Sequence, residues 1–479
     1  MSTAARPQIA TPSFQAANWT SWAILAADVV ALEAALALGL GVRRMLAPWF
    51  TAAIGVEQYF AVAVGILLLP IVHYQLGIYP GYLLGPVERL RRRTLATLAV
   101  FGGLVAWDNI VARGVLSRGV LLATLVFALV LPLLAESLAR RILVSRKRWG
   151  VPVVMLGAGP TGRLIVQTLF SEPQLGLVPI AFLDNRPEAW NQMVENIPVV
   201  GPLGLAQDFE RRAEAVIVAL ADLEKGDIAA LLQELNFPRV IVIPQFTNMA
   251  SLSVTARDLG GCLGLEIKKN LLMPRNLVLK QMMDRAIALP LFLMSIPVMA
   301  GAAVWIKLIS RGPAFHCQMR EGIDGRSIEV WKLRTMHVDG ERLLEPWFSE
   351  HPEDRLEWAR YFKLRRDPRV LPQIGKLLRR TSLDELPQLW SVLKGEMSLV
   401  GPRPFPDYHL EHFSAEFRTL RTRVLPGLTG MWQVSARSHG DVAVQEALDT
   451  YYIRNWSPWL DLYILARTVA AVVMARGAY

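Results

Sequence analysis

The residues best suited to chemistry lie between positions 376 and 404, in the stretch KLLRRTSLDELPQLWSVLKGEMSLVGPRP. Two adjacent carboxylates, Asp384 and Glu385, follow an arginine pair, and a rigid cationic turn, GPRP, occupies residues 401–404. A carboxylate can act as a nucleophile or as a magnesium ligand, and a guanidinium group offers a planar fork to phosphate oxygens. The combination indicates phosphoryl-transfer chemistry.

The same carboxylates also fit a purely structural role. Ser382 and Glu385 have the spacing of a capping box, and acidic residues in a first helical turn interact favourably with the helix dipole. Spacing alone favours capping, because helix starts of this kind are common. The stretch predicts a helix that begins at the carboxylates and runs to about Leu393, with Pro387 in its first turn.

The whole stretch resembles the signature of the bacterial sugar transferases, membrane enzymes that move a hexose-1-phosphate from a UDP-sugar to a polyprenyl phosphate. The resemblance runs from about Lys280 to the C-terminus and favours the catalytic interpretation over capping. It implies that Asp384 is the nucleophile, and that Glu385 binds Mg²⁺ or takes a proton. It further implies that residues 275–479 form an α+β monotopic phosphoglycosyl transferase domain.

The resemblance also implies a set of substrate-binding side chains. Four basic residues would bind phosphates: Lys332, Arg334, Arg379 and Arg403. The segment 425–437, LPGLTGMWQVSAR, resembles the motif for the uridine end of the donor, which gives Gln433 and Arg437. Leu425 stands where the family usually has Arg, and Ala436 where it usually has Gly.

The composition predicts membrane segments. Hydrophobic residues make up 53% of the 479 residues and charged residues only 19%, too apolar for an ordinary soluble protein. Four apolar runs, 22–42, 58–78, 94–112 and 120–139, are each near the ~20 residues that a spanning helix needs. Basic clusters at 89–93 and 140–148 predict that these loops and the N-terminus face the cytoplasm.

A fifth apolar run, 286–306, predicts a different relation to the membrane. It is long enough to span, but basic residues flank both of its ends, and Pro290 and Pro297 interrupt it. A helix that enters one leaflet, bends and returns satisfies both flanks and keeps the carboxylates on the cytoplasmic side. The predicted bend includes Ser295 and Pro297; in the related family the serine directly precedes the proline, whereas here Ile296 intervenes.

Between the membrane helices and the catalytic region, the sequence predicts a Rossmann-like α/β domain over residues 146–270. The buried strand VPVVMLG leads into Gly157-Ala-Gly-Pro-Thr-Gly162, and Asp184 follows a second strand about twenty residues on. A dinucleotide site is one interpretation; glycines that only serve a tight turn are the other. We favour a structural or regulatory role, because the Tyr-x-x-x-Lys dyad of nucleotide-sugar oxidoreductases is absent from the sequence.

The net charge of +10 fits anionic lipids and phosphorylated substrates, and the sequence carries no nucleic-acid-binding signature. The two cysteines and scattered histidines do not predict a disulfide scaffold or zinc site. We therefore predict a multi-pass protein of the bacterial inner membrane, with residues 1–145 forming four helices and a cytoplasmic catalytic domain. Its expected substrates are a UDP-hexose, galactose or glucose, and undecaprenyl phosphate. A homodimer is possible. Two alternative functions stay open: a membrane-tethered NAD-dependent nucleotide-sugar enzyme and a non-catalytic scaffold.

Overall fold

A computed structural model describes residues 15–49, 56–111, 116–220, 231, 234–243, 254–258, 263–267, 270–361, 364, 367–435 and 442–473. Its contacts divide the chain into two units, residues 1–249 and 250–479. The first unit holds the N-terminal helices and a parallel sheet, and the second holds the acidic pair at positions 384 and 385.

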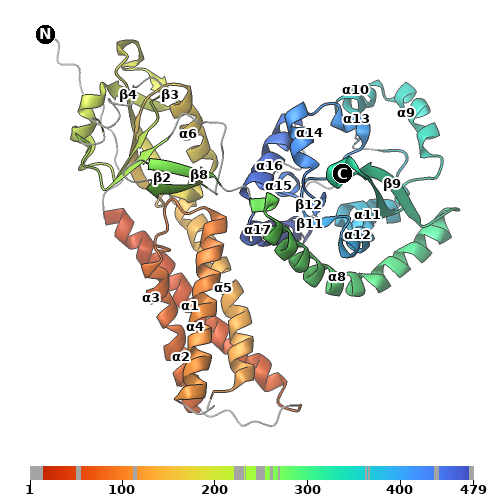
Figure 1. Cartoon of the computed structure of the whole chain (residues 1–479), viewed down its shortest axis with the longest axis horizontal. Helices are drawn as coiled ribbons and strands as arrows, with labels where there is room; N and C mark the ends of the chain where they lie inside the picture. The colour runs from red at the N-terminus through yellow and green to blue at the C-terminus, as the bar shows by residue number, and fades with distance from the viewer. Residues whose placement is uncertain are drawn as a thin grey trace. The chain divides into compact units, whose positions relative to one another are not determined.

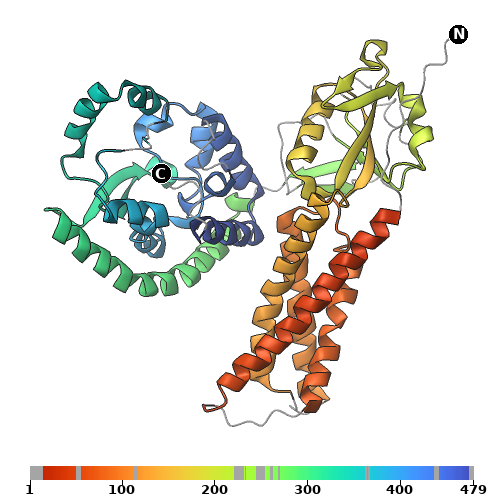
Figure 2. The ribbon, with the colours of Figure 1, turned by 180° about the vertical axis from the view of Figure 1, so that it is seen from behind.

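Helices cover all four of the N-terminal apolar runs: α1 (Gln15–Met45), α2 (Val56–Ile66), α3 (Leu68–Gln75), α4 (Pro86–Ile110) and α5 (Arg118–Ser145). Figures 1 and 2 show α1, α4 and α5 lying side by side. Of the described helices, those long and apolar enough to cross a membrane include α1 and α5 here and α8 (Pro274–Ile309) in the second unit. The second predicted run is divided at Leu67, and α4 begins with the arginine cluster.

Buried charges join the N-terminal helices. Arg93 on α4 donates to Asp28 on α1 at 2.6 Å and pairs with Glu136 on α5 at 2.6 Å. Glu136 also binds Arg140, one turn further along α5. Isolated charges in such an environment would be costly, so the pairing of opposite charges fixes the relative positions of three helices.

A six-stranded sheet follows the bundle, in the order β3-β4-β2-β1-β5-β6. Its strands are β1 (Val151–Leu156), β2 (Leu177–Leu183), β3 (Met193–Val194), β4 (Ile197–Gly201), β5 (Ala215–Val218) and β6 (Arg239–Val242). All neighbours pair in parallel except β3 and β4, which form an antiparallel hairpin. The predicted strand–glycine turn–helix unit is confirmed, because α6 (Pro160–Ser171) begins directly after Gly159.

The second unit is built around α8 and a set of short elements. Figure 1 shows α8 as a curved helix along one side of this unit. After α8, the strands β9 (Phe315–Glu321) and β10 (Ser327–Leu333) pair in antiparallel register as a hairpin. The antiparallel strands β7 (Val254–Asp258) and β8 (Leu263–Ile267) lie within the range 146–270 predicted for the α/β domain, but they fall in this unit.

The remaining elements of the second unit surround the acidic pair. They are α9 (Leu344–Glu350), α10 (Pro352–Tyr361), α11 (Ile374–Thr381), the 3-10 turn η7 (Leu383–Glu385), α12 (Gln388–Lys394), β11 (Ser398–Val400), α13 (Asp407–Leu410), α14 (Ala415–Arg421), β12 (Gly427–Thr429), α15 (Met431–Ser435), α16 (Val442–Asn455) and α17 (Pro458–Val473). Strands β11 and β12 pair in parallel. One apolar core packs the end of α8 against Leu333 of β10 and Leu378 of α11.

Candidate active site

The acidic pair lies in a break between two helices, not at the start of one. Helix α11 ends at Thr381, and Ser382 adopts the left-handed conformation with φ of 55°. Residues Leu383–Glu385 form a single 3-10 turn, and α12 begins only after Pro387. The predicted helix from the carboxylates to Leu393 is therefore wrong at its start, because Ser382 and Pro387 both interrupt regular helical structure.

The capping-box interpretation of Ser382 and Glu385 is also wrong. The Ser382 side chain makes no capping hydrogen bond, and it is the Glu385 backbone amide that donates to the Ser382 carbonyl, at 3.3 Å. Helix α11 reaches its position because Gly375 allows close contact: a Cβ there would lie 2.5 Å from the Thr335 carbonyl oxygen. The turn consequently presents both carboxylates to a cavity and does not use them as helix caps.

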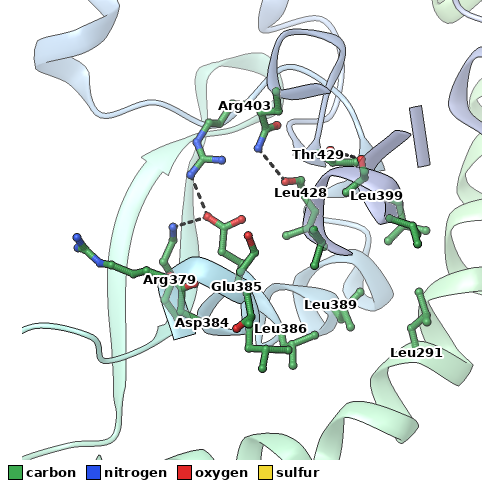
Figure 3. A pocket seen from close by; sticks show the side chains of 18 of the residues that line it. Leu291, Arg379, Asp384, Glu385, Leu386, Leu389, Leu399, Arg403, Leu428 and Thr429 are labelled. Carbon is green, nitrogen blue, oxygen red and sulfur yellow. Dashed lines mark hydrogen bonds and ion pairs between the residues drawn. The ribbon is translucent and has the colours of Figure 1, made fainter. Parts of the chain in front are cut away.

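Glu385 is held by two cations from different elements. Lys332 Nζ on β10 donates to Glu385 Oε1 at 2.7 Å, and Arg403 Nη2 donates to the same oxygen at 2.9 Å. Figure 3 shows the contact between Arg403 and Glu385. Burial opposes ionisation, but the two cations outweigh it and lower the pKa of Glu385 to about 2. Glu385 is thus a fixed negative charge at neutral pH.

Asp384 lies in a contrasting environment. Burial raises its pKa to about 6, with Lys332 lowering it and the neighbouring charge of Glu385 raising it. Arg379, whose Nε donates to Thr335 Oγ1 at 3.1 Å, lies in the same cavity and also favours ionisation of Asp384. Two adjacent carboxylates with such separated pKa values can take different chemical roles.

The cavity that holds the pair has a volume of about 760 Å³. Lys332, Arg379, Asp384, Glu385, Arg403 and Gln433 all line it, so the structure brings together most of the predicted site. Gln433 Nε2 donates to the Leu428 carbonyl at 3.4 Å. Arg437 lies outside the described residues.

Arg334 is placed elsewhere. It is 6% exposed, it does not line this cavity, and its guanidinium donates to the carbonyls of Ser310 and Arg311 at 2.9 Å each. These carbonyls end α8, so Arg334 anchors the exit of that helix to β10. The predicted bend residues lie within α8, where Ser295 Oγ donates to the Phe292 carbonyl at 2.7 Å and Pro297 is inside the helix.

Contacts with neighbouring segments hold the backbone at Arg403 in position. It follows Gly401, where a Cβ would lie 2.6 Å from the Leu425 carbonyl, so the turn packs closely against the segment leading into β12. Arg421 donates to the Arg403 carbonyl at 2.8 Å and to Glu321 at 3.0 Å. The position of the Arg403 backbone is therefore set by a buried ion pair.

Two cavity residues escaped the sequence analysis. Arg369 donates to both oxygens of Asp367, at 2.8 and 2.6 Å, and its guanidinium lies 4.7 Å from the centre of the Trp358 ring. Both residues line the cavity. The Asp-Pro-Arg sequence at 367–369, a turn signal, is the clue that could have identified them.

The glycine turn of the α/β domain has its own acidic residue. Asp184 accepts from the Ala158 amide at 2.8 Å and from the Arg186 guanidinium at 3.0 and 2.8 Å. The hydrogen bond from the Arg186 side chain is the largest cause that lowers the pKa of Asp184 to about 2. A carboxylate thus already occupies the amide that would face a phosphate, which agrees with a structural role for the turn.

The donor set of the cavity suits Mg²⁺ only in part. Among the described residues, no group of three His, Cys, Asp or Glu side chains is placed to hold a metal ion. Magnesium usually binds one or two carboxylates together with substrate phosphates, and Glu385, whose Oε1 accepts from Lys332 and Arg403, would offer its second oxygen.

An ionisable carboxylate beside a fixed anion, surrounded by cationic side chains in a unit built on an apolar helix, is the arrangement expected of a membrane-associated phosphoryl transferase. Comparisons with known proteins narrow this class. Residues 275–475 match the family model of the bacterial sugar transferases, and residues 75–243 match that of a CoA-binding domain.

Curated relatives cover most of the chain. An undecaprenyl-phosphate galactose phosphotransferase of Salmonella typhimurium is 31% identical over 81% of each chain. A UDP-glucose:undecaprenyl-phosphate glucose-1-phosphate transferase of Klebsiella pneumoniae is 28% identical over 71% of this chain and 70% of its own. An exopolysaccharide production protein of Sinorhizobium fredii is 44% identical over 36% of this chain and 76% of its own. The chain belongs to the bacterial sugar transferase family and is a phosphoglycosyl transferase.

Proposed function

We propose that this enzyme transfers galactose-1-phosphate from UDP-galactose to undecaprenyl phosphate and releases UMP, as the first step in assembling an O-antigen, capsule or exopolysaccharide repeat unit. The observation that carries the proposal is the contrast between the carboxylates. Glu385 is bound by Lys332 and Arg403, whereas Asp384 faces the cavity with a pKa of about 6. Galactose is preferred over glucose because the Salmonella relative matches more of the chain than the Klebsiella one.

The reaction proceeds in two displacements at one phosphorus atom. The ionised carboxylate of Asp384 attacks the β-phosphorus of the donor, the bond from this phosphorus to the bridging oxygen breaks, and UMP leaves with the electron pair. A phosphate oxygen of the lipid then attacks the same phosphorus and releases Asp384 as a carboxylate. Covalent catalysis of this kind lets two dissimilar substrates use one site in turn.

The surrounding residues supply charge and orientation. Arg379, Arg403 and Lys332 bind the diphosphate oxygens, and Arg403 offers a planar fork that suits two oxygens at once. Glu385 keeps Lys332 and Arg403 in position before the donor arrives. Glu385 would hold Mg²⁺, which would neutralise diphosphate charge when bound. Gln433 contributes to the uridine end of the site.

The donor half of the reaction provides the test. Without lipid, the purified enzyme should release one UMP per active site from UDP-galactose and retain the phospho-sugar on Asp384, where peptide mass spectrometry after an acid quench would find it. A panel of UDP-sugars then ranks the donors. Kinetics that require both substrates to be bound together would contradict the mechanism, and a faster burst with UDP-glucose would reassign the donor.

The proposed membrane arrangement keeps this site on the cytoplasmic face of the inner membrane. Four N-terminal segments span the bilayer, and α8 enters one leaflet and returns. Support comes from the basic residues at both ends of its apolar run, Arg285 and Lys307, and from Pro290 and Pro297 within the helix. Cysteines engineered near residue 320 should resist a membrane-impermeant reagent added to whole cells. Labelling there would mean that α8 crosses the membrane.

The alternative function, a membrane-tethered NAD-dependent enzyme, has less support. The Asp184 carboxylate already accepts hydrogen bonds from the Ala158 amide and the Arg186 guanidinium. A dinucleotide site uses the corresponding acidic residue for the ribose, and here that residue would have to break its ion pair first.

A further inference from the structure

The turn that carries the two carboxylates begins at Ser382, which also lines the cavity. The Glu385 amide donates to the Ser382 carbonyl at 3.3 Å, so the serine and both carboxylates belong to one turn of chain. Figure 3 shows Asp384 and Glu385 of this turn at the cavity. A substrate that reacts with Asp384 therefore lies close to Ser382.

The Ser382 hydroxyl is available to such a substrate. It has no hydrogen-bond partner among the described residues, and the side chain is partly buried. The hydroxyl of the preceding residue, Thr381, also lies at the cavity, but it donates to the Leu377 carbonyl at 2.8 Å and contacts the Leu378 carbonyl at 3.3 Å. Since partly buried hydroxyl groups normally have a partner, the Ser382 hydroxyl is the one that a ligand can engage.

The backbone at Ser382 favours glycine. Its φ and ψ are 55° and 21°, and its amide closes α11 by donating to the Arg379 carbonyl at 3.2 Å. Helix α12 ends in the same way at Gly395, with φ of 83° and ψ of 15°. Glycine adopts this conformation freely, whereas a residue with a Cβ is strained there. A strained residue beside a reactive group indicates that its side chain has a role.

We propose that the Ser382 hydroxyl donates a hydrogen bond to a non-bridging oxygen of the phosphoryl group that Asp384 accepts and passes on. This inference rests on the proposed function and adds a catalytic residue to it. The same phosphorus is attacked in both displacements, so the hydroxyl acts in both. Lys332, Arg379 and Arg403 supply positive charge, and Ser382 supplies a neutral, directional donor at the oxygens where charge develops. The proton stays on Oγ, and no bond to Ser382 forms or breaks.

The test compares Ser382→Gly with Ser382→Ala, which both remove the hydroxyl but differ in backbone preference. The Ser382→Gly protein should melt at a higher temperature than the Ser382→Ala protein, because only glycine adopts a positive φ without strain. UMP release from UDP-galactose without lipid should nevertheless fall about 10²-fold in both variants, the typical loss for one transition-state donor. Discharge of the adduct by undecaprenyl phosphate should slow by a similar factor.

Ser391→Ala is the matched control. It removes a hydroxyl from α12 that donates to the Glu329 carbonyl at 3.5 Å and lies outside the cavity lining, so both half-reactions should keep the wild-type rate. Circular dichroism checks that each variant is folded.

Three results would overturn the inference and leave the proposed function standing. The first is wild-type UMP release in Ser382→Gly. The second is a loss confined to Ser382→Ala, because the residue would then matter only through its backbone. The third is a loss in one half-reaction alone, since the hydroxyl would then contact an entering or leaving group and not the transferred phosphoryl group. If wild type itself releases no UMP from any UDP-sugar, the proposed function fails and the inference fails with it.

Discussion

Two acidic sites in this molecule are built from the same parts and reach opposite states. In the α/β domain, Asp184 is 4% exposed and accepts hydrogen bonds from a backbone amide and from Arg186. In the second unit, Lys332 and Arg403 both go to Glu385, while the adjacent Asp384 has its pKa raised to about 6. A carboxylate whose hydrogen bonds are complete stabilises a turn. Because Glu385 binds the two cations, the adjacent Asp384 carboxylate keeps its lone pairs available for reaction.

The comparison also shows how a motif misleads. The GxGxxG pattern has its expected setting between β1 and α6, yet its acidic partner closes the turn internally. The stretch from 379 to 385 fits a helix cap by spacing, yet Ser382 caps nothing. In both cases the decisive fact is where the hydrogen bonds go, and spacing along the chain does not determine that.

The largest expected effect comes from Asp384→Asn. The amide has nearly the same size but is a far poorer nucleophile, so transfer should fall by at least about 10³-fold. UMP release in the absence of lipid should disappear, and so should the covalent adduct. The measurement is single-turnover UMP release, with circular dichroism as the folding control. Substantial activity in a folded variant would place the nucleophile elsewhere.

Glu385→Gln should reduce the rate by about 10²-fold, a typical magnitude for loss of a positioning or proton-transfer group, without removing the adduct. It should also shift the pH dependence. The charge of Glu385 raises the pKa of Asp384, so removing it lowers that pKa and moves the acidic limb of UMP release below pH 6.

The wild type should therefore lose about tenfold per pH unit below pH 6, as Asp384 becomes protonated. In Glu385→Gln the decline should begin at lower pH. Glu396→Gln, at an exposed pair with Lys394, is the control and should keep the wild-type profile. An acidic limb that does not move in Glu385→Gln would mean that Asp384 does not govern it.

Much of the chain could be predicted from its sequence because the signals are local. The strands, the hairpin and the apolar helices follow from periodicity and turn residues, and the acid pair with its basic neighbours follows from a continuous motif. The placement of Arg334 could not be predicted, because its partners at the end of α8 lie more than twenty residues away and offer only carbonyls. The aliphatic lining of the cavity could not be predicted either, since α8, α12 and α17 meet only in three dimensions.

Arg403→Lys should have a smaller effect than either carboxylate change. A lysine keeps the charge and the reach toward Glu385 but cannot bind two phosphate oxygens at once. We expect KM for the donor to rise about tenfold, a loss of roughly 1.4 kcal/mol, with a weaker effect on kcat. Arg418→Lys, on α14 outside the cavity lining, should change neither parameter. Wild-type KM for the donor in Arg403→Lys would show that the fork is not used.

The smallest effect on catalysis, and a distinct effect on stability, should come from Asp184→Asn. Its pKa is lowered to about 2 in the folded protein, so its ionised form stabilises the fold above the unfolded-state pKa near 4 and loses that contribution as pH falls toward 2. The difference amounts to roughly 2 kcal/mol at neutral pH. Hydrogen exchange at pH 7 should therefore speed up in β1 and β2 of the variant, while UMP release stays at the wild-type rate. Gly162→Leu should also destabilise this domain and leave UMP release unchanged, because a Cβ there would lie 2.1 Å from the Gly157 carbonyl oxygen. If a folded variant lost turnover and added nucleotide restored it, the glycine turn would bind a ligand. The two acidic sites would then both bind ligands and would differ only in which ligand each one binds.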